Sequence, residues 1–339
     1  MATGNSSLND KPSLRDLLEV QNHFGLPSPA LVEKDWYVVK ALAAINSADT
    51  APFRLVFGGG TALSRAHRLV RRMSEDIDLK ITSDAQFTRP ALRGLRDTIT
   101  KALLDAGFGF DPANPVHRDS ANVSRHTSYR LSYAPVAEGK GSLRPEIQIE
   151  TAVWPLRLPA VPLPVRSFVA EALNLPPEVP VIACASIVET VAEKFVAPTK
   201  RAGAELADAG GPRDSTLVRH VYDLHVLRAF YEPAAVIALA QTIMHADADV
   251  YGHQFPAYRR ARLLRRNEQS QEWPQIRLLP RTTPRSCKRW SMERYANSSG
   301  GFPRLKAWRM DFSGLPAPPY VRATHQAIRA LGICNGPTR

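Results

Sequence analysis

Residues 56–81, VFGGGTALSRAHRLVRRMSEDIDLKI, place three consecutive glycines after one short apolar run and two aspartates inside a second one. The residues before the glycines are β-rich, and those from about 61 to 71 have helical spacing. The stretch SEDIDLKI then alternates isoleucine and leucine with Asp76, Asp78 and Lys80, which predicts a strand with one polar face. This segment therefore predicts a strand, a glycine turn, a helix and a second strand in one unit.

The two aspartates are the first candidate for chemistry. At positions i and i+2 of a strand, Asp76 and Asp78 point to the same face, with Cα atoms roughly 6–7 Å apart. Two like charges at this separation repel each other unless a cation lies between them. Mg²⁺ is commonly held by one or two carboxylates together with substrate phosphates. A solvated strand edge with two acids is the competing interpretation, and the D-x-D pattern alone favours it.

The glycine turn is the second candidate. Glycines let backbone N–H groups approach a phosphate, and a helix N-terminus carries partial positive charge. A tight strand-to-helix turn without a ligand is the competing interpretation. The sequence is neither a Walker A loop, which would continue with Gly-Lys-Ser/Thr, nor a G-x-G-x-x-G dinucleotide fingerprint. The combination of glycine turn and D-x-D within one unit favours a nucleotide with its magnesium ions.

This combination resembles the nucleotidyltransferase superfamily related to DNA polymerase beta. The resemblance is closer to the AbiEii-type nucleotidyltransferases, which are toxins of bacterial toxin–antitoxin and abortive-infection systems. The similar segments are GGTALSRAHRLVRRMSEDIDL, VEKDWYVVKAL before it, and VETVAEKFVA and RHVYDLHVL after it. They extend from Leu31 to about Leu227, with weaker similarity through VYGHQFPAYR.

The resemblance implies a set of metal-binding carboxylates. Asp76 and Asp78 would bind magnesium, with two ions expected, and a third catalytic acid would lie on a later strand. In EIQIE, Glu146 and Glu150 share one strand face, so two candidates remain. Glu150 better fits a pattern in which the acid follows alternating apolar residues, and we choose it. Glu146 directly follows Pro145, which suits the beginning of the strand.

The resemblance also implies residues that contact the nucleotide. The expected nucleotide-binding residues are Gly59, Gly60, Thr61, Ser74 and Lys194. Lys194 would reach the phosphates from a helix, and Asp223 would be either a base or an orienter of Lys194. The competing interpretation of Lys194 is an ordinary helix surface pair with Glu193. Asp223 and Arg219, at i and i+4, would share a helix face and could form an ion pair. Many relatives carry aspartate where this chain has His220, so the role of that position is open.

Three further charged clusters receive structural interpretations. Among Arg65, Arg68, Arg71 and Arg72, one is expected to contact phosphate or acceptor while most are solvated. Glu33, Lys34 and Asp35 are expected to form a structural ion-pair cluster without chemistry. His245, Asp247 and Asp249 resemble a metal site, but we interpret them as the end of a helix.

The expected fold is α+β. Residues 1–162 would form a nucleotidyltransferase-like domain with a small mixed sheet and flanking helices. A proline-rich connector, residues 163–180, would lead into a helical domain that ends near residue 258 and completes the active-site cleft. Residues 259–339 form a basic segment rich in Arg, Pro and Ser, whose periodicity is weak. A basic tail, a partner-dependent segment and a damaged reading frame are all open interpretations of it.

The charge is concentrated in that last segment. The formal net charge is +12, and residues 259–310 hold fourteen Lys/Arg but three acids, so they contribute eleven of those charges. Such a segment suits an acidic partner such as nucleic acid. No apolar run is long enough to span a bilayer, the start lacks a secretory h-region, and the three cysteines are far apart. We therefore expect a cytoplasmic protein that does not contact membranes.

The resemblance implies Mg²⁺-dependent transfer of a nucleotide from a nucleoside triphosphate (NTP) to an RNA acceptor, the 3′ end of tRNA, by a toxin that has a cognate antitoxin. Nucleotidyl transfer to a protein side chain or to a small molecule is the first alternative. The second is a non-catalytic relative that binds nucleotide, RNA or antitoxin.

Overall fold

The computed structural model describes residues 11–137, 143–207 and 217–251. All of them belong to one compact unit, Met1–Arg259. The basic segment expected from residue 259 onward lies outside the described residues. No helix among the described residues is both long enough and apolar enough to cross a membrane.

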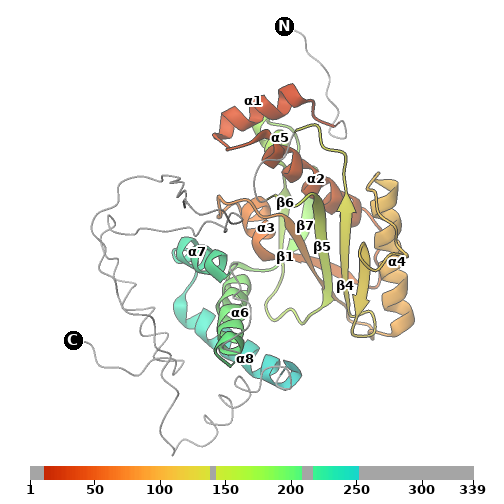
Figure 1. Ribbon diagram of the computed structural model, residues 1–339. Coiled ribbons are helices and arrows are strands. Elements are labelled where there is room, and N and C mark those ends of the chain that lie inside the picture. Colours follow the sequence, from red (N-terminus) through yellow and green to blue (C-terminus); the bar gives the residue numbers. More distant parts are fainter. Residues whose placement is uncertain (1–10, 138–142, 208–216, 252–339) are drawn as a thin grey trace, which may run out of the picture. The chain divides into compact units, whose positions relative to one another are not determined.

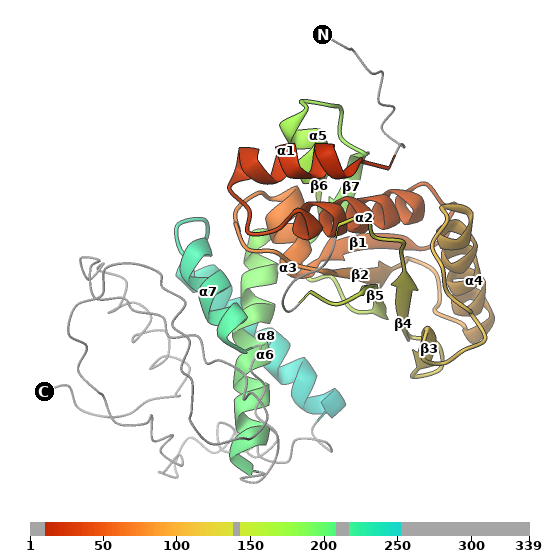
Figure 2. The same cartoon turned by 45° about the horizontal axis from the view of Figure 1, so that its top comes forward.

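A seven-stranded mixed sheet forms the centre of this unit, in the order β3-β4-β5-β2-β1-β7-β6 (Figures 1 and 2). The central strand β2 runs antiparallel to β1 and parallel to β5, and β1 runs parallel to β7. The strands are β1 (Arg54–Gly58), β2 (Asp76–Thr82), β3 (Arg118–Ala121), β4 (His126–Ser132), β5 (Glu146–Val153), β6 (Val161–Val165) and β7 (Val179–Cys184). Together with the helices, the sheet confirms the expected α+β class.

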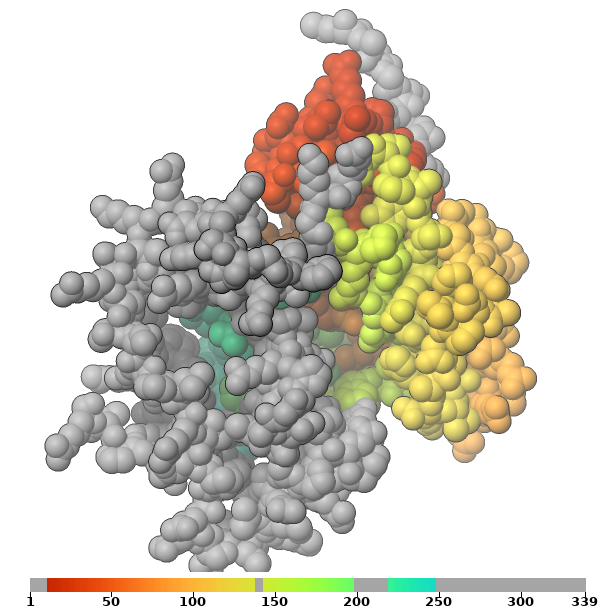
Figure 3. All heavy atoms as spheres, viewed as in Figure 1, coloured from red at the N-terminus to blue at the C-terminus, as the bar shows by residue number. Residues whose placement is uncertain are grey.

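Helices α2 (Pro29–Asn46) and α4 (Arg89–Asp105) pack on the apolar face of the sheet. That face exists because β2 alternates as expected: Ile77, Leu79 and Ile81 are buried in the same core as the apolar residues of both helices. Helix α1 (Leu14–Phe24) begins at a capping box formed by Ser13 and Asp16 and forms an outer surface, red in Figure 3. The polar face of β2 is therefore left for other partners.

Helices α6 (Ile187–Ala207), α7 (Leu217–Leu227) and α8 (Pro233–Tyr251) form the helical part of the described chain. Their buried apolar residues, among them Val191, Leu227 and Ile243, share one core with Leu63 and Val70, which come from the segment after the glycine turn. The helical part is thus packed directly against the chain that follows the glycines.

The chain after the glycines differs from the expected helix over residues 61–71. It forms a single helical turn, α3 (Gly59–Thr61), continues as a π-helical turn over Ala62–Ala66, and then runs irregularly to β2. Arg68 has a left-handed backbone with φ 57°. The apolar spacing that suggested a longer helix arises because Leu63 and Val70 both pack against the helical part.

Residues 163–180, expected to form a connector, contribute to the sheet instead. They complete β6, form the short helix α5 (Phe168–Ala172) and begin β7. Because β6 starts at Val161 and pairs with β7, the sheet continues past the boundary expected at residue 162. The last helix is also longer than expected: α8 continues through His245, Asp247 and Asp249 to Tyr251, so these residues do not end it.

Candidate active site

The polar face of β2 brings the three expected carboxylates to one place in the sheet. Asp78 is in register with Gly58 of β1 and with Glu150 of β5. Asp76 is in register with Gln148, whose Nε2 donates a hydrogen bond of 2.9 Å to Oε1 of Glu150. Glu150 is therefore the acid beside Asp78, whereas Glu146 begins β5 opposite Ser132 of β4.

The two aspartates have too little positive charge around them. The pKa of Asp78 is raised to about 7, first by burial and then by the charges of Glu150 and Asp76, and Lys194 only partly opposes this shift. Burial is also the main reason that the pKa of Asp76 is raised, although Arg144 opposes the shift. Both carboxylates would be stabilised in their charged form by an added cation.

The pKa of Glu150 is shifted in the opposite direction from those of the two aspartates. Its neighbour His126 on β4 is the main cause of a lowered pKa for Glu150, and Glu150 in turn raises the pKa of His126. The two groups lie 3.9 Å apart (Nε2 to Oε2), which is an ion-pair distance and too long for a hydrogen bond. His126 thus favours the ionised form of Glu150. The sequence analysis did not single out His126.

Arg144 is a second site residue that the sequence analysis missed. Its Nη1 lies 2.7 Å from Oδ1 of Asp76 and donates a hydrogen bond of 2.5 Å to Oε1 of Gln148. Its backbone N–H donates to Oε2 of Glu75 at 3.1 Å. Arg144 thus supplies a positive charge to Asp76 from a position 68 residues further along the chain, with no local motif to indicate it.

The glycine turn is pressed against the D-x-D strand. Gly59 has φ 70°, and a Cβ atom there would lie 1.8 Å from Oδ2 of Asp78. A Cβ on Gly60 would lie 2.8 Å from both Nη2 of Arg72 and Oγ of Ser74. The hydroxyl of Thr61 donates a hydrogen bond to the carbonyl oxygen of Asp76. Four of the residues expected to bind the nucleotide therefore lie in the turn and the chain packed beside Asp76 and Asp78: Gly59, Gly60, Thr61 and Ser74.

Lys194 on α6 and Asp223 on α7 meet Arg72 on this side of the site. Nζ of Lys194 lies 2.8 Å from Oδ2 of Asp223. Arg72 donates to both oxygens of the same carboxylate, from Nε at 2.7 Å and from Nη2 at 2.6 Å. Burial alone would raise the pKa of Asp223, but Arg72 and Lys194 together lower it. Both oxygens are engaged here instead of pairing with Arg219, which is exposed on α7.

Glu193 pairs with Lys80 of β2 rather than with its neighbour on the helix. Nζ of Lys80 donates to Oε1 of Glu193 at 2.5 Å and to Oε1 of Glu189 at 3.0 Å. Because Lys80 lies on the same strand face as the two aspartates, these contacts fasten α6 to the polar face of β2. The competing interpretation, a surface pair of Glu193 with Lys194, therefore does not describe Glu193, whose partner is Lys80.

The expectation that most of the four arginines are solvated holds for two of them and fails for the other two. Arg65 stacks over the Phe168 ring at 3.8 Å and Arg72 binds Asp223, so the expectation that most of the four are solvated fails for these two. Arg68 forms an ion pair with Glu171, and Arg71 is exposed.

The structural role of the N-terminal cluster, Glu33, Lys34 and Asp35, is confirmed by its partners. Glu33 accepts from the Val136 and Ala137 N–H groups, Lys34 pairs with Glu75, and Asp35 accepts from the Phe168 N–H.

The carboxylates do not form a complete protein cage for a metal. Across the part of the chain that the structure describes, no three His, Cys, Asp or Glu side chains are arranged to hold one ion together. The expected binding of magnesium by Asp76, Asp78 and Glu150 therefore stays a prediction.

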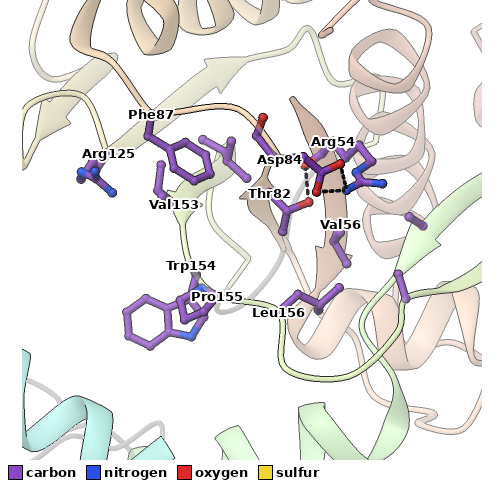
Figure 4. Close-up of a pocket in the computed structure, with 14 residues that line it drawn as sticks. Arg54, Val56, Thr82, Asp84, Phe87, Arg125, Val153, Trp154, Pro155 and Leu156 are labelled. Carbon is purple, nitrogen blue, oxygen red and sulfur yellow. Dashed lines mark hydrogen bonds and ion pairs between the residues drawn. The ribbon is translucent and has the colours of Figure 1, made fainter. Parts of the chain in front are cut away.

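A separate pocket lies at the other end of β2. It has a volume of about 590 Å³, and Figure 4 shows Phe87, Trp154 and Leu156 around it, with Arg54 paired to Asp84 at one side. Thr82, the last residue of β2, lines it, whereas Asp76 begins that strand. The pocket is therefore distinct from the carboxylate site.

A glycine turn after the first strand, D-x-D on the neighbouring strand and an acid beside it on a third strand form the arrangement expected of a nucleotidyltransferase. The chain matches the family described as "Nucleotidyl transferase AbiEii toxin, Type IV TA system" over residues 40–295, and it belongs to that family. The protein is therefore a nucleotidyltransferase and the toxin of a type IV toxin–antitoxin system.

A solved structure with a similar fold is MenT4, a nucleotidyltransferase toxin from Mycobacterium tuberculosis H37Rv. It is 21% identical in sequence, with a TM-score of 0.46, and the similarity covers 70% of this chain and 73% of MenT4. No curated protein sequence matches the chain.

Proposed function

We propose that this enzyme binds an NTP with magnesium at the glycine turn and transfers its nucleotide to a hydroxyl of an RNA acceptor, the 3′ end of tRNA. One observation carries the proposal. Asp78, with its pKa raised to about 7, lies beside Asp76 and against the backbone of Gly59. The two carboxylates have too little positive charge around them and lie next to a turn suited to phosphate. A metal–triphosphate complex would be stabilised at such a place.

The donor set fits magnesium. Asp76 and Asp78 offer the hard oxygen ligands that Mg²⁺ prefers, and such ions commonly complete their coordination with substrate phosphates and water. The lack of a complete protein cage is consistent with a site that is completed by the substrate. Bound magnesium would neutralise the two aspartates and the charge that develops on the reacting phosphate.

The chain's own residues would then bind and orient the reactants. The N–H groups of the glycine turn and the ammonium of Lys194 would hold the phosphates, and Asp223 would hold Lys194 in place. The acceptor oxygen would attack the α-phosphorus, forming a new P–O bond, while the bond to pyrophosphate breaks and pyrophosphate leaves. Glu150, kept ionised by His126, would accept the proton of the attacking hydroxyl.

Two observations support RNA as the acceptor. The first is the family resemblance, which implies tRNA. The second is the basic segment, since eleven of the twelve excess positive charges lie within residues 259–310. A concentrated positive charge favours binding to a phosphate backbone.

The test is a transfer assay with bulk tRNA, Mg²⁺ and each of the four NTPs labelled at the α-phosphate. We expect one or more NTPs to label tRNA with the wild type, and Asp76→Asn and Asp78→Asn to reduce labelling at least about 100-fold, as expected for loss of a metal ligand. Asp84→Asn is the matched control, because Asp84 is exposed just after the same strand. Oxidising the tRNA 3′ diol with periodate should abolish labelling.

The other outcomes are equally informative. Label that enters protein or a small molecule instead of tRNA would replace the RNA acceptor with the corresponding alternative. Labelling that survives both aspartate substitutions would refute the assignment of the site.

A further inference from the structure

Asp223 holds two cations with one buried carboxylate. Its side chain is fully buried, and Arg72 and Lys194 contact it at 2.6–2.8 Å. One carboxylate cannot neutralise both cations, so this group of three keeps one excess positive charge. That excess positive charge is available to an anion that reaches the two cations.

The two cations lie where a triphosphate would be bound. Nη2 of Arg72 lies so close to Gly60 that a Cβ on that glycine would approach it to 2.8 Å. Nζ of Lys194 and Nη2 of Arg72 contact the same atom, Oδ2 of Asp223, at 2.8 and 2.6 Å, so the two cations lie together. Arg72 and Lys194 therefore border the glycine turn.

Arg72 also has donors left for a ligand. A guanidinium group has five N–H donors. Nε and Nη2 each donate one to Asp223, and Nη1 donates one to the carbonyl oxygen of Met73 at 3.2 Å. Two donors have no partner among the residues that the structure describes, and one of them is on the Nη2 atom beside Gly60. The Arg72 side chain keeps 20% of its surface exposed, so a ligand can reach it.

We propose that Arg72 is a second triphosphate-binding cation, and that Arg72, Lys194 and Asp223 form a phosphate clamp. Within this clamp Asp223 is a positioning residue: its two oxygens are occupied by the cations, and it accepts no proton from the acceptor. The inference rests on the proposed function, because it assumes that the triphosphate of an NTP lies at the glycine turn.

The competing explanation is an ion pair that only joins the chain before β2 to α7. The two explanations differ in ligand dependence. A phosphate clamp contacts the β- and γ-phosphates, so its loss weakens binding of a triphosphate and spares a monophosphate of the same base. A purely structural ion pair, when broken, would affect both ligands alike.

The experiment measures binding of non-transferable α,β-methylene NTP analogues by calorimetry, with Mg²⁺ present. The nucleoside monophosphate of the same base is measured in parallel. Salt of about 0.3 M screens the basic segment, because the screening length falls to about 6 Å. The proteins are full-length wild type, Arg72→Met, Arg72→Lys and the control Arg71→Met, which changes an exposed neighbour.

We expect Arg72→Met to weaken triphosphate binding about 10- to 100-fold, the usual effect of losing charge-assisted hydrogen bonds. Monophosphate binding should stay within about twofold, and Arg71→Met should match the wild type. If Arg72→Met does not fold, Arg72→Lys decides, since it keeps a charge for Asp223 but lacks the two-pronged donor geometry. It should weaken triphosphate binding alone, by several-fold.

Three results would overturn the clamp: folded Arg72 variants that bind the triphosphate like the wild type, equal losses for both ligands, or a wild type that binds no triphosphate. Only the last would also remove the proposed function, so the two failures are distinguishable.

Discussion

Asp35 is a buried carboxylate whose ionisation opposes folding. It accepts a hydrogen bond of 2.7 Å from the Phe168 N–H and lies 3.4 Å from Nε of Arg65. Burial raises its pKa to about 6, more than Arg65 and the Phe168 N–H can offset, and the charges of Glu178 and Glu171 add to the shift. In the unfolded chain the same group ionises near its ordinary value, so the folded state binds its proton more tightly.

This linkage predicts a pH-dependent difference between the wild type and Asp35→Asn. Below its pKa in the unfolded chain, near 4, the wild-type carboxyl is protonated in both the folded and the unfolded state. It then does not lower the free energy of unfolding. Between about pH 4 and 6 the unfolded state loses its proton first, so the wild type loses stability that the variant keeps. The variant should therefore gain about 3 kcal/mol relative to the wild type across this range, with no further change above it. Thermal unfolding at a series of pH values measures this, and parallel curves would contradict it.

Asp78 provides a prediction for metal removal. Because its carboxylate lacks a compensating charge, Mg²⁺ should raise the unfolding temperature of the wild type, and EDTA should reverse the increase. Asp78→Asn removes the charge that attracts the ion and should abolish the response, while Asp84→Asn should retain it. A response that is unchanged in Asp78→Asn would place the metal elsewhere.

At the scale of the structural element, the glycine turn is shaped by the strand beside it. Gly59→Ala should destabilise the protein by at least about 2 kcal/mol, since alanine at positive φ is strained and its Cβ would overlap Asp78. Gly60→Ala should cost less, because Gly60 has no positive φ and its Cβ would meet Arg72 and Ser74 at 2.8 Å, whereas a Cβ on Gly59 would meet Asp78 at 1.8 Å.

Gly94→Ala is the matched control for the two turn variants. Gly94 lies inside α4, and a Cβ there meets nothing within 4 Å. The substitution should stabilise the protein by about 0.5–1 kcal/mol through helix propensity. Denaturant unfolding ranks the three variants. Equal effects of Gly59→Ala and Gly60→Ala would show that the contact with Asp78 does not determine how much a substitution in the turn destabilises the protein.

These contacts explain how far the sequence could predict the structure. The strand, the glycine turn and the second strand followed from local patterns, because period-two alternation and consecutive glycines act over a few residues. The π-helical turn at Ala62–Ala66 did not follow, because Leu63 and Val70 have helical spacing but are buried by the distant helices α6 to α8. The spacing of apolar residues shows which of them are buried, and here a segment that is not a regular α-helix has the spacing of one.

The candidate site shows the same division. Asp76, Asp78 and the glycines carry a recognisable motif, and strand register then identifies Glu150 as the neighbour of Asp78. The pairings of the cations around the site join distant parts of the chain: Arg72 pairs with Asp223 across 151 positions, and Arg144 pairs with Asp76 across 68. A single sequence has no local signal for such pairs.

In the molecule as a whole, the residues expected to bind the nucleotide and most of the positive charge occupy different parts of the chain. The expected site residues all lie between residues 59 and 223, whereas residues 259–310 carry most of the net charge. If that segment binds the RNA acceptor, neutralising it should weaken RNA binding without changing affinity for the NTP analogue.

A charge-matched pair of variants tests this separation. The first replaces five arginines at the start of the basic segment by glutamine and lowers the formal net charge from +12 to +7: Arg259, Arg260, Arg262, Arg265 and Arg266. The second makes the same change in net charge at five exposed positions elsewhere: Arg15, Arg54, Arg89, Arg93 and Lys101. Any difference between the two therefore reports where the charge lies.

We expect the first variant to bind tRNA more weakly, and its affinity to depend less on salt. Each lost phosphate contact should reduce the slope of log affinity against log salt by about 0.7–0.9, because fewer counterions are released. The second variant should keep a slope close to that of the wild type, and both should bind the NTP analogue normally. Filter binding of labelled tRNA at four salt concentrations measures the slopes. Equal slopes for the two variants would mean that RNA responds to overall net charge, and the basic segment would lose its role as the acceptor-binding element.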